Sequence, residues 1–169
     1  MKTTLQKIVI SSLFAALICV ATMVIKIPSP LKGYINLGDG IVLLAAWILP
    51  LPYGLVASGL GSALADILSG YVVYAPATFV IKALMAVVAY SFYNLFTKKA
   101  KSTVSRVFSG TLAEIVMILG YFLFEGIMYG FAPSLVNIPA NAVQGVAGIV
   151  IGVVLIKFFE KQNIIKLLK

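Results

Sequence analysis

Long apolar stretches separated by short polar breaks run along the whole chain. A membrane-spanning helix needs about 20 mostly apolar residues, and proline interrupts such helices. The prolines that mark breaks here are Pro28, Pro30, Pro50, Pro52, Pro76, Pro133 and Pro139. The pattern predicts six helices, at about residues 5–25, 37–49, 53–69, 77–96, 107–129 and 138–159. The first is longer than the apolar core of a signal peptide, so we expect it to be retained.

The second predicted helix, 37–49, is shorter than the others. At 1.5 Å per residue it reaches only about 20 Å into a membrane core of about 30 Å. It is therefore either partly re-entrant or extended by residues 33–36.

Basic residues predict the orientation of these helices, because cytoplasmic loops carry an excess of lysine and arginine. They gather before the first helix, between the fourth and fifth, and after the sixth: Lys2, Lys7, Lys98, Lys99, Lys101, Arg106, Lys161, Lys166 and Lys169. An even number of spans puts all three places on one side. We therefore expect both termini in the cytoplasm, with Lys26 and Lys32 as exceptions in the first outer loop.

Composition agrees with a membrane protein. The chain is 62% hydrophobic and 11% charged, against about 25% charged residues in soluble domains, and its mean hydropathy is +1.09. The prediction is an all-α integral membrane protein that forms one domain over residues 1–169. The net charge of +8 flanks apolar segments, so a nucleic acid is not an expected partner.

Several kinds of chemistry are not expected. The chain has no histidine and one cysteine, which excludes Ser-His-Asp and Cys-His catalysis and the commonest zinc ligand. It also lacks the phosphate-binding motif G-x-x-x-x-G-K-[ST] of ATPases. We therefore expect no enzyme activity, no metal and no cofactor.

Ionisable side chains at membrane depth are costly, yet this chain keeps several. Under the predicted topology most of its buried polar residues lie at one level, near the outer surface. Helical spacing of three and four residues also places Asn141 with Gln144, and Tyr121 with Glu125, on common faces. The convergence predicts an outward-facing pocket. The candidate ligand-binding residues are Asn36, Asp39, Tyr74, Lys82, Tyr121, Glu125, Asn141 and Gln144, and the candidate wall residues are Asp66, Thr78 and Glu114.

Structural roles compete with ligand binding at several of these positions. Asp66 and Lys82 either form an ion pair between the third and fourth helices or line the pocket. Asp39 either caps the second helix or contacts the ligand. Tyr71 and Tyr74 are either interfacial belt residues or a cover over a ring-shaped ligand.

Small residues form two stripes on the first helix, at Ser11, Ala15 and Cys19 and at Ser12 and Ala16. Small residues four apart let helix backbones approach closely in lipid. The stripes therefore predict either close packing within the chain or a docking face for a partner helix.

Three motifs carry a resemblance to a known family. They read INLGDGIVLLAA, GSALADILSGY and YAPATFVIKALM. With them the chain resembles, over its whole length, the substrate-binding S components of energy-coupling factor (ECF) vitamin transporters. It departs from the family in reading ALAD where relatives often place Gly before Asp, and Ser-x-x-x-Ala where many carry Ala-x-x-x-Ala.

The resemblance implies a six-helix protein of the prokaryotic cell membrane that binds a vitamin from outside and topples in the lipid bilayer to release it. It also implies docking through the first helix, at Ser11, Ser12, Ala15, Ala16 and Cys19, on an EcfT-type coupling subunit that two cytosolic ATPase subunits drive.

The motifs are most similar to the branch for vitamin B6 and hydroxymethylpyrimidine. We therefore expect vitamin B6 (pyridoxine, pyridoxamine or pyridoxal) first, hydroxymethylpyrimidine second and riboflavin third. Two alternatives belong to other classes. They are a membrane-embedded enzyme that uses Asp39, Asp66 and Glu125, and an exporter that couples to ions through Asp66 or Glu114.

Overall fold

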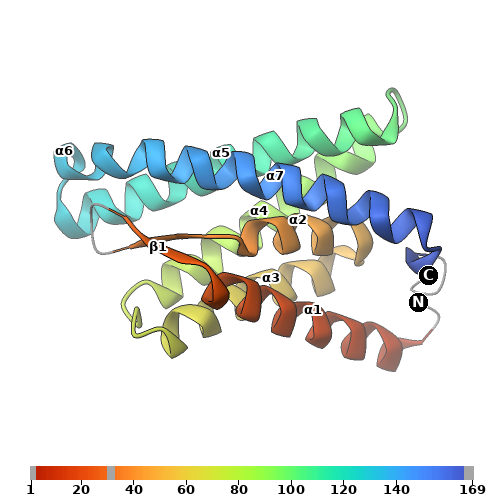
Figure 1. Cartoon of the computed structure of the whole chain (residues 1–169), viewed down its shortest axis with the longest axis horizontal. Helices are drawn as coiled ribbons and strands as arrows, with labels where there is room; N and C mark the ends of the chain where they lie inside the picture. The colour runs from red at the N-terminus through yellow and green to blue at the C-terminus, as the bar shows by residue number, and fades with distance from the viewer. Residues whose placement is uncertain (1–2, 30–32, 166–169) are drawn as a thin grey trace.

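The computed structural model describes residues 3–29 and 33–165. Helices running along one long axis dominate it (Figure 1). The elements are α1 (Thr4–Val24), β1 (Lys26–Pro28), β2 (Tyr34–Asn36), α2 (Gly38–Ile48), α3 (Leu51–Leu68), α4 (Ala75–Phe96), α5 (Ser102–Tyr129), α6 (Phe131–Ser134), a 3-10 turn η1 (Leu135–Asn137) and α7 (Ile138–Lys161). The predicted positions Lys2, Pro30, Lys32, Lys166 and Lys169 lie outside the described residues.

Among these residues, five helices are long and apolar enough to cross a membrane, and α2 is a shorter apolar helix. The predicted all-α membrane fold is confirmed. The α5 helix begins at Ser102, five residues before the position expected from hydropathy, because its first turns are polar but still helical.

The outer connections hold structure that the hydropathy pattern missed. Residues 34–36 do not extend α2; they form strand β2, which pairs antiparallel with β1. Residues 131–137, expected to form a loop, fold into α6 and η1. Gly130, with φ of 94°, ends α5 and turns the chain into α6.

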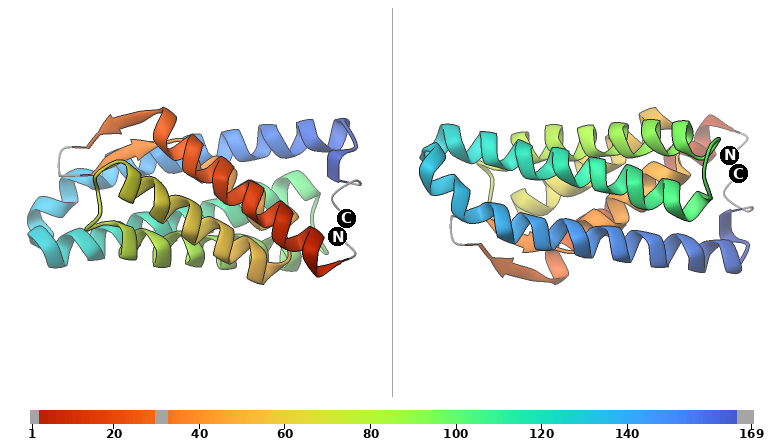
Figure 2. Two further views of the ribbon diagram at one scale, coloured as in Figure 1. Left: turned by 90° about the horizontal axis from the view of Figure 1, so that it is seen from below. Right: turned by 90° about the horizontal axis from the view of Figure 1, so that it is seen from above.

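The two ends of the bundle differ. The start of α1 and the end of α7 lie at the same end of the bundle, which we call the inner end (Figure 1). The β1–β2 hairpin and α6 lie at the opposite, outer end (Figures 1 and 2). The exposed basic residues Lys98, Lys99, Lys101 and Lys161 belong to the inner end. This arrangement matches the predicted even number of spans.

The short helix α2 forms the centre of the molecule. It packs against α1, α3, α4 and α7, and every residue from Val42 to Ile48 is buried. Large apolar residues such as Leu13, Leu119 and Val146 instead remain more than half exposed on the outside of the bundle. An apolar exterior around a packed interior fits lipid as the surrounding solvent.

The α1 helix turns its two small-residue stripes in different directions. A Cβ atom added to Gly61 of α3 would lie 2.5 Å from the carbonyl oxygen of Ala15, so α1 and α3 meet closely there. Ala15 and its neighbours Ser11 and Cys19 are partly buried, whereas Ser12 and Ala16 are exposed. One stripe therefore packs inside the chain and the other remains available.

Candidate functional site

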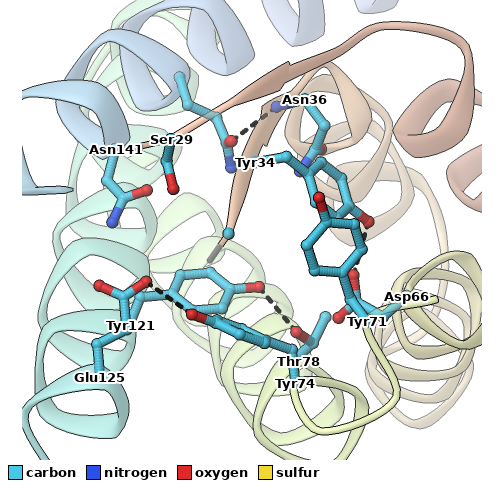
Figure 3. A pocket seen from close by; sticks show the side chains of 12 residues that line it. Ser29, Tyr34, Asn36, Asp66, Tyr71, Tyr74, Thr78, Tyr121, Glu125 and Asn141 are labelled. Atoms are coloured by element: carbon cyan, nitrogen blue, oxygen red, sulfur yellow. Dashed lines mark hydrogen bonds between the residues drawn. The ribbon is translucent and has the colours of Figure 1, made fainter. Parts of the chain in front are cut away.

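A polar pocket opens at the outer end of the bundle, beside the β1–β2 hairpin (Figure 3). Its walls enclose about 400 Å³ of empty space, including the part open to solvent. The lining residues are Ser29, Gly33, Tyr34, Asn36, Asp66, Tyr71, Tyr74, Thr78, Tyr121, Glu125, Asn141 and Gln144. The hairpin, α3, α4, α5 and α7 thus all contribute to one site.

Tyrosines form much of the wall. The rings of Tyr34 and Tyr71 lie 4.7 Å apart, and those of Tyr71 and Tyr74 lie 6.3 Å apart and edge to face. Burial, followed by the hydrogen bond to Asp66, raises the pKa of Tyr34. Its hydroxyl therefore stays protonated and donates to Asp66 Oδ1 at 2.6 Å. Aromatic faces beside polar groups suit a planar ligand with polar edges.

Two carboxylates give the pocket its electrostatic character. Glu125 Oε1 accepts hydrogen bonds from Asn137 Nδ2 at 2.8 Å and from the Tyr74 hydroxyl at 3.4 Å. Glu125 Oε2 and Asp66 Oδ2 are buried and have no hydrogen-bond partner among the described residues. The described lining contains no lysine or arginine. The pocket is therefore rich in acceptors and favours neutral or cationic ligands.

Asn36 and Gln144 connect the pocket to the start of α2. The Asn36 backbone N–H donates to Gln144 Oε1 at 2.8 Å, and Asn36 Oδ1 accepts from the Gly38 N–H at 2.9 Å. The side chain that caps α2 is therefore Asn36, which corrects the capping role considered for Asp39. Gln144 Nε2 in turn donates to Asp39 Oδ2 at 2.7 Å.

Asp39 and Lys82, predicted to bind ligand, do not line this pocket. They form an ion pair buried beneath it, in which Lys82 Nζ donates to Asp39 Oδ1. The partner of Lys82 is thus Asp39 and not Asp66, since Lys82 reaches from α4 toward the central helix α2. Asp66 lies on the pocket side of α3 and bonds Tyr34 instead.

Glu114, a candidate wall residue from the sequence, lies outside the pocket lining. It is 3% exposed, and neither carboxylate oxygen has a hydrogen-bond partner among the described residues. A Cβ atom added to Gly148 of α7 would lie 2.7 Å from Glu114 Oε1. Glu114 therefore fills the close approach between α5 and α7.

The other predicted pocket residues do converge. Tyr74, Thr78, Tyr121 and Asn141 all line the pocket, and the Thr78 and Tyr121 hydroxyls lie 3.0 Å apart. Sequence reasoning missed Ser29, Gly33 and Tyr34, because they belong to the hairpin and carry no helical spacing. The sequence signal that could have identified Tyr34 is its position, as an aromatic residue directly before the INLGD motif. Among the described residues, no cluster of His, Cys, Asp and Glu could hold a metal.

Comparison with known proteins gives matches over most of the chain. Residues 2–161 match the family described as the ECF-type riboflavin transporter S component. A Pyrococcus woesei protein, described as an uncharacterized protein in the gap 3' region, is 37% identical over 137 residues, which are 80% of this chain and 88% of that protein.

A solved structure described as the S component of a bacterial ECF transporter has the same fold. It matches with a TM-score of 0.77 over 95% of this chain and 99% of its own, at 22% identity. The fold of this chain is therefore the fold of that solved S component.

Proposed function

Because this chain belongs to the ECF-type riboflavin transporter S-component family, we propose that its outer pocket binds riboflavin for uptake into the cell. S components are the substrate-binding subunits of transporters. The description of the family supports riboflavin ahead of vitamin B6 and hydroxymethylpyrimidine, which the motifs placed first. The observation that carries the proposal is an acceptor-rich, tyrosine-walled pocket in a member of this family.

The chemistry of riboflavin suits these walls. Its flat ring system can lie against Tyr71 or Tyr74, and its pyrimidine edge carries one N–H donor between two carbonyl acceptors. The unpartnered oxygen of Glu125 can accept from that N–H, and the Asn141 amide can donate to a carbonyl. Hydroxyl groups of the sugar-like chain can donate to Asp66 Oδ2.

The same carboxylates disfavour phosphate. A phosphorylated ligand would place about two negative charges beside Asp66 and Glu125 with no cation in the described lining. The proposed ligand is therefore riboflavin and not its 5'-phosphate.

Vitamin B6 is the second candidate. Pyridoxamine carries an amine that becomes cationic, and hydroxymethylpyrimidine carries an exocyclic amine. Either amine would find acceptors at Glu125 and Asp66.

The proposed partners follow from the family. We propose an EcfT-type coupling subunit in the cell membrane and two cytosolic ATPase subunits, which would supply the ATP hydrolysis that this chain has no motif for. The exposed stripe of Ser12 and Ala16 on α1 is the proposed docking face.

Mass spectrometry of the small molecule that copurifies with the protein tests the substrate without presupposing it. We expect unphosphorylated riboflavin in the wild-type protein, and much less in a Glu125→Gln variant purified in the same way. Recovery of pyridoxamine instead would select the second candidate. A phosphorylated ligand bound in stoichiometric amount would contradict the proposed charge selection.

A further inference from the structure

A second pocket lies at the inner end of the bundle, and it exists because α2 is short. Its 11 residues reach only about 16 Å, after which Pro50 and Pro52 turn the chain back into α3. The neighbouring helices α4, α5 and α7 continue past this turn toward the inner end (Figure 1). About 910 Å³ of empty space, including the part open to solvent, remains below the end of α2.

Polar groups from three helices face this space, under a roof made by Trp47, Leu49 and Pro50. Tyr93 of α4 and Arg106 of α5 belong to the lining. Glu160 of α7 is the acidic residue among the described lining residues. The inner pocket therefore combines an apolar roof with charged and hydroxyl-bearing walls.

Arg106 is the dominant group in the inner pocket. It is only 4% exposed, and its guanidinium donates from Nη2 to Glu160 Oε1 at 2.6 Å and from Nη1 to Glu160 Oε2 at 3.2 Å. Nη2 also lies 3.3 Å from the Tyr93 hydroxyl. The Nε–H has no hydrogen-bond partner among the described residues. The guanidinium thus retains one buried donor that no residue in the described ranges satisfies.

The counterion of Arg106 can leave, because the Glu160 side chain is 45% exposed whereas that of Arg106 is 5% exposed. Glu160 can rotate into water at small cost, but Arg106 stays buried and needs an anion in its place. A phosphate group is such an anion, because its oxygens match the planar fork of N–H donors.

The positive charge around the inner pocket also favours binding of an anion. Exposed lysines surround this end, three in the connection between α4 and α5 and two on α7: Lys98, Lys99, Lys101, Lys157 and Lys161. Under the positive-inside rule this end faces the cytoplasm, where anionic headgroups attract basic clusters and occupy basic pockets between helices.

We propose that the inner pocket binds a phosphate-bearing anion, with Arg106 as the recognition residue and Glu160 as the group that the anion displaces. The anion is either the headgroup of an anionic lipid or a soluble phosphate ester. This site lies at the opposite end of the bundle from the vitamin pocket and does not depend on which vitamin binds there.

Trp47 is the chain's one tryptophan and lines the inner pocket, so its fluorescence reports occupancy. The protein, purified in detergent without vitamin, is titrated with dihexanoyl phosphatidylglycerol, dihexanoyl phosphatidylcholine, glycerol 3-phosphate and inorganic phosphate. A saturable change with phosphatidylglycerol but not glycerol 3-phosphate identifies a lipid headgroup, and comparable changes with the soluble anions identify a phosphate ester. Both results support the proposal.

Substitutions at two positions, Glu160 and Arg106, distinguish anion binding from a purely structural ion pair. Glu160→Gln removes the competing carboxylate and is expected to tighten binding of the anion at least fivefold. Arg106→Gln is expected to weaken it at least tenfold, with Arg106→Lys intermediate. Lys26→Gln, which removes an exposed lysine of β1 at the outer end, serves as the matched surface control with less than a twofold effect. Size-exclusion profiles check that each variant is folded.

A structural ion pair alone predicts different results. Wild-type protein would then show no saturable change with any of the four probes, or Arg106→Gln and Arg106→Lys would bind as tightly as wild type. Either result would overturn the proposal. Vitamin binding would be unaffected in both cases, so the proposed function is tested separately.

Discussion

At the scale of residues, the charged groups of the outer half divide between two tasks. Asp39 and Lys82 neutralise each other in the interior, and Gln144 satisfies the second oxygen of Asp39. Asp66 and Glu125 line the pocket, and each keeps one oxygen that no described residue bonds. The first pair holds helices together, and the second pair is available to a ligand.

Glu125 gives the sharpest test at this scale. Glu125→Gln removes the negative charge and an acceptor, so we expect riboflavin affinity to fall more than tenfold, about 1.4 kcal/mol or more. The matched control is Glu114→Gln, a buried carboxylate on the same helix that does not line the pocket. Equal effects of both variants, measured by equilibrium titration, would show that the pocket is wrongly placed.

Breaking the buried ion pair is expected to destabilise the protein. Lys82→Met leaves the Asp39 charge buried without its counterion, which costs about 3–5 kcal/mol. Adding Asp39→Asn removes that charge while keeping an acceptor for Gln144, so we expect the double variant to recover most of the loss. Thermal unfolding in detergent measures both. A double variant no more stable than Lys82→Met would argue against the pair.

The sequence predicted the depth of these residues but not their partners. Hydropathy and helical spacing placed Tyr74, Tyr121, Glu125, Asn141 and Gln144 near one level, and the pocket contains all of them. Which carboxylate bonds Lys82 depends on helix rotation and crossing, which spacing along one chain does not specify. The pairing with Asp39 therefore required the three-dimensional structure.

At the scale of elements, α1 combines internal packing with an available face. Its Ala15 backbone contacts Gly61 of α3, while Ser12 and Ala16 face outward. Neighbouring residues on one helix therefore have opposite roles, and a docking partner can approach closely only along the Ser12 and Ala16 stripe.

Paired substitutions on α1 test this division. Ala16→Trp is expected to leave riboflavin affinity and stability unchanged but to weaken copurification with the coupling subunit at least tenfold. Ala15→Trp is expected to lower the unfolding temperature because its side chain would press against α3. Val146→Trp, which is 64% exposed on α7, is the control for a bulky lipid-facing residue.

Unimpaired copurification of the Ala16→Trp variant with the coupling subunit would show that docking uses another face. A drop in stability for Ala16→Trp as large as that for Ala15→Trp would contradict the assignment of the two stripes.

The hydropathy pattern predicted the long helices but not the structure of the connections between them. Six apolar runs between prolines correspond to α1, α2, α3, α4, α5 and α7, with small shifts at their ends. The β1–β2 hairpin consists of two three-residue strands, too short for alternation to be recognised. The hairpin nevertheless supplies Ser29, Gly33 and Tyr34 to the pocket.

At the scale of the whole molecule, the short central helix organises both ends. Its first turn lies beneath the outer pocket, where Asn36 caps it and Asp39 anchors it. Its last turn ends above the inner pocket at Trp47 and Leu49. The proposed vitamin site and the proposed anion site thus lie at opposite ends of one buried helix, within a bundle whose exterior is apolar.

We propose above that the outer pocket binds an unphosphorylated ring vitamin. Equilibrium titration of the purified protein with riboflavin, riboflavin 5'-phosphate, pyridoxine, pyridoxamine and hydroxymethylpyrimidine tests it most directly. We expect riboflavin binding tighter than about 10 µM, or about 7 kcal/mol, and at least hundredfold weaker binding of the 5'-phosphate. Binding no tighter than about 10 µM for every unphosphorylated vitamin, or a preference for the 5'-phosphate, would contradict it.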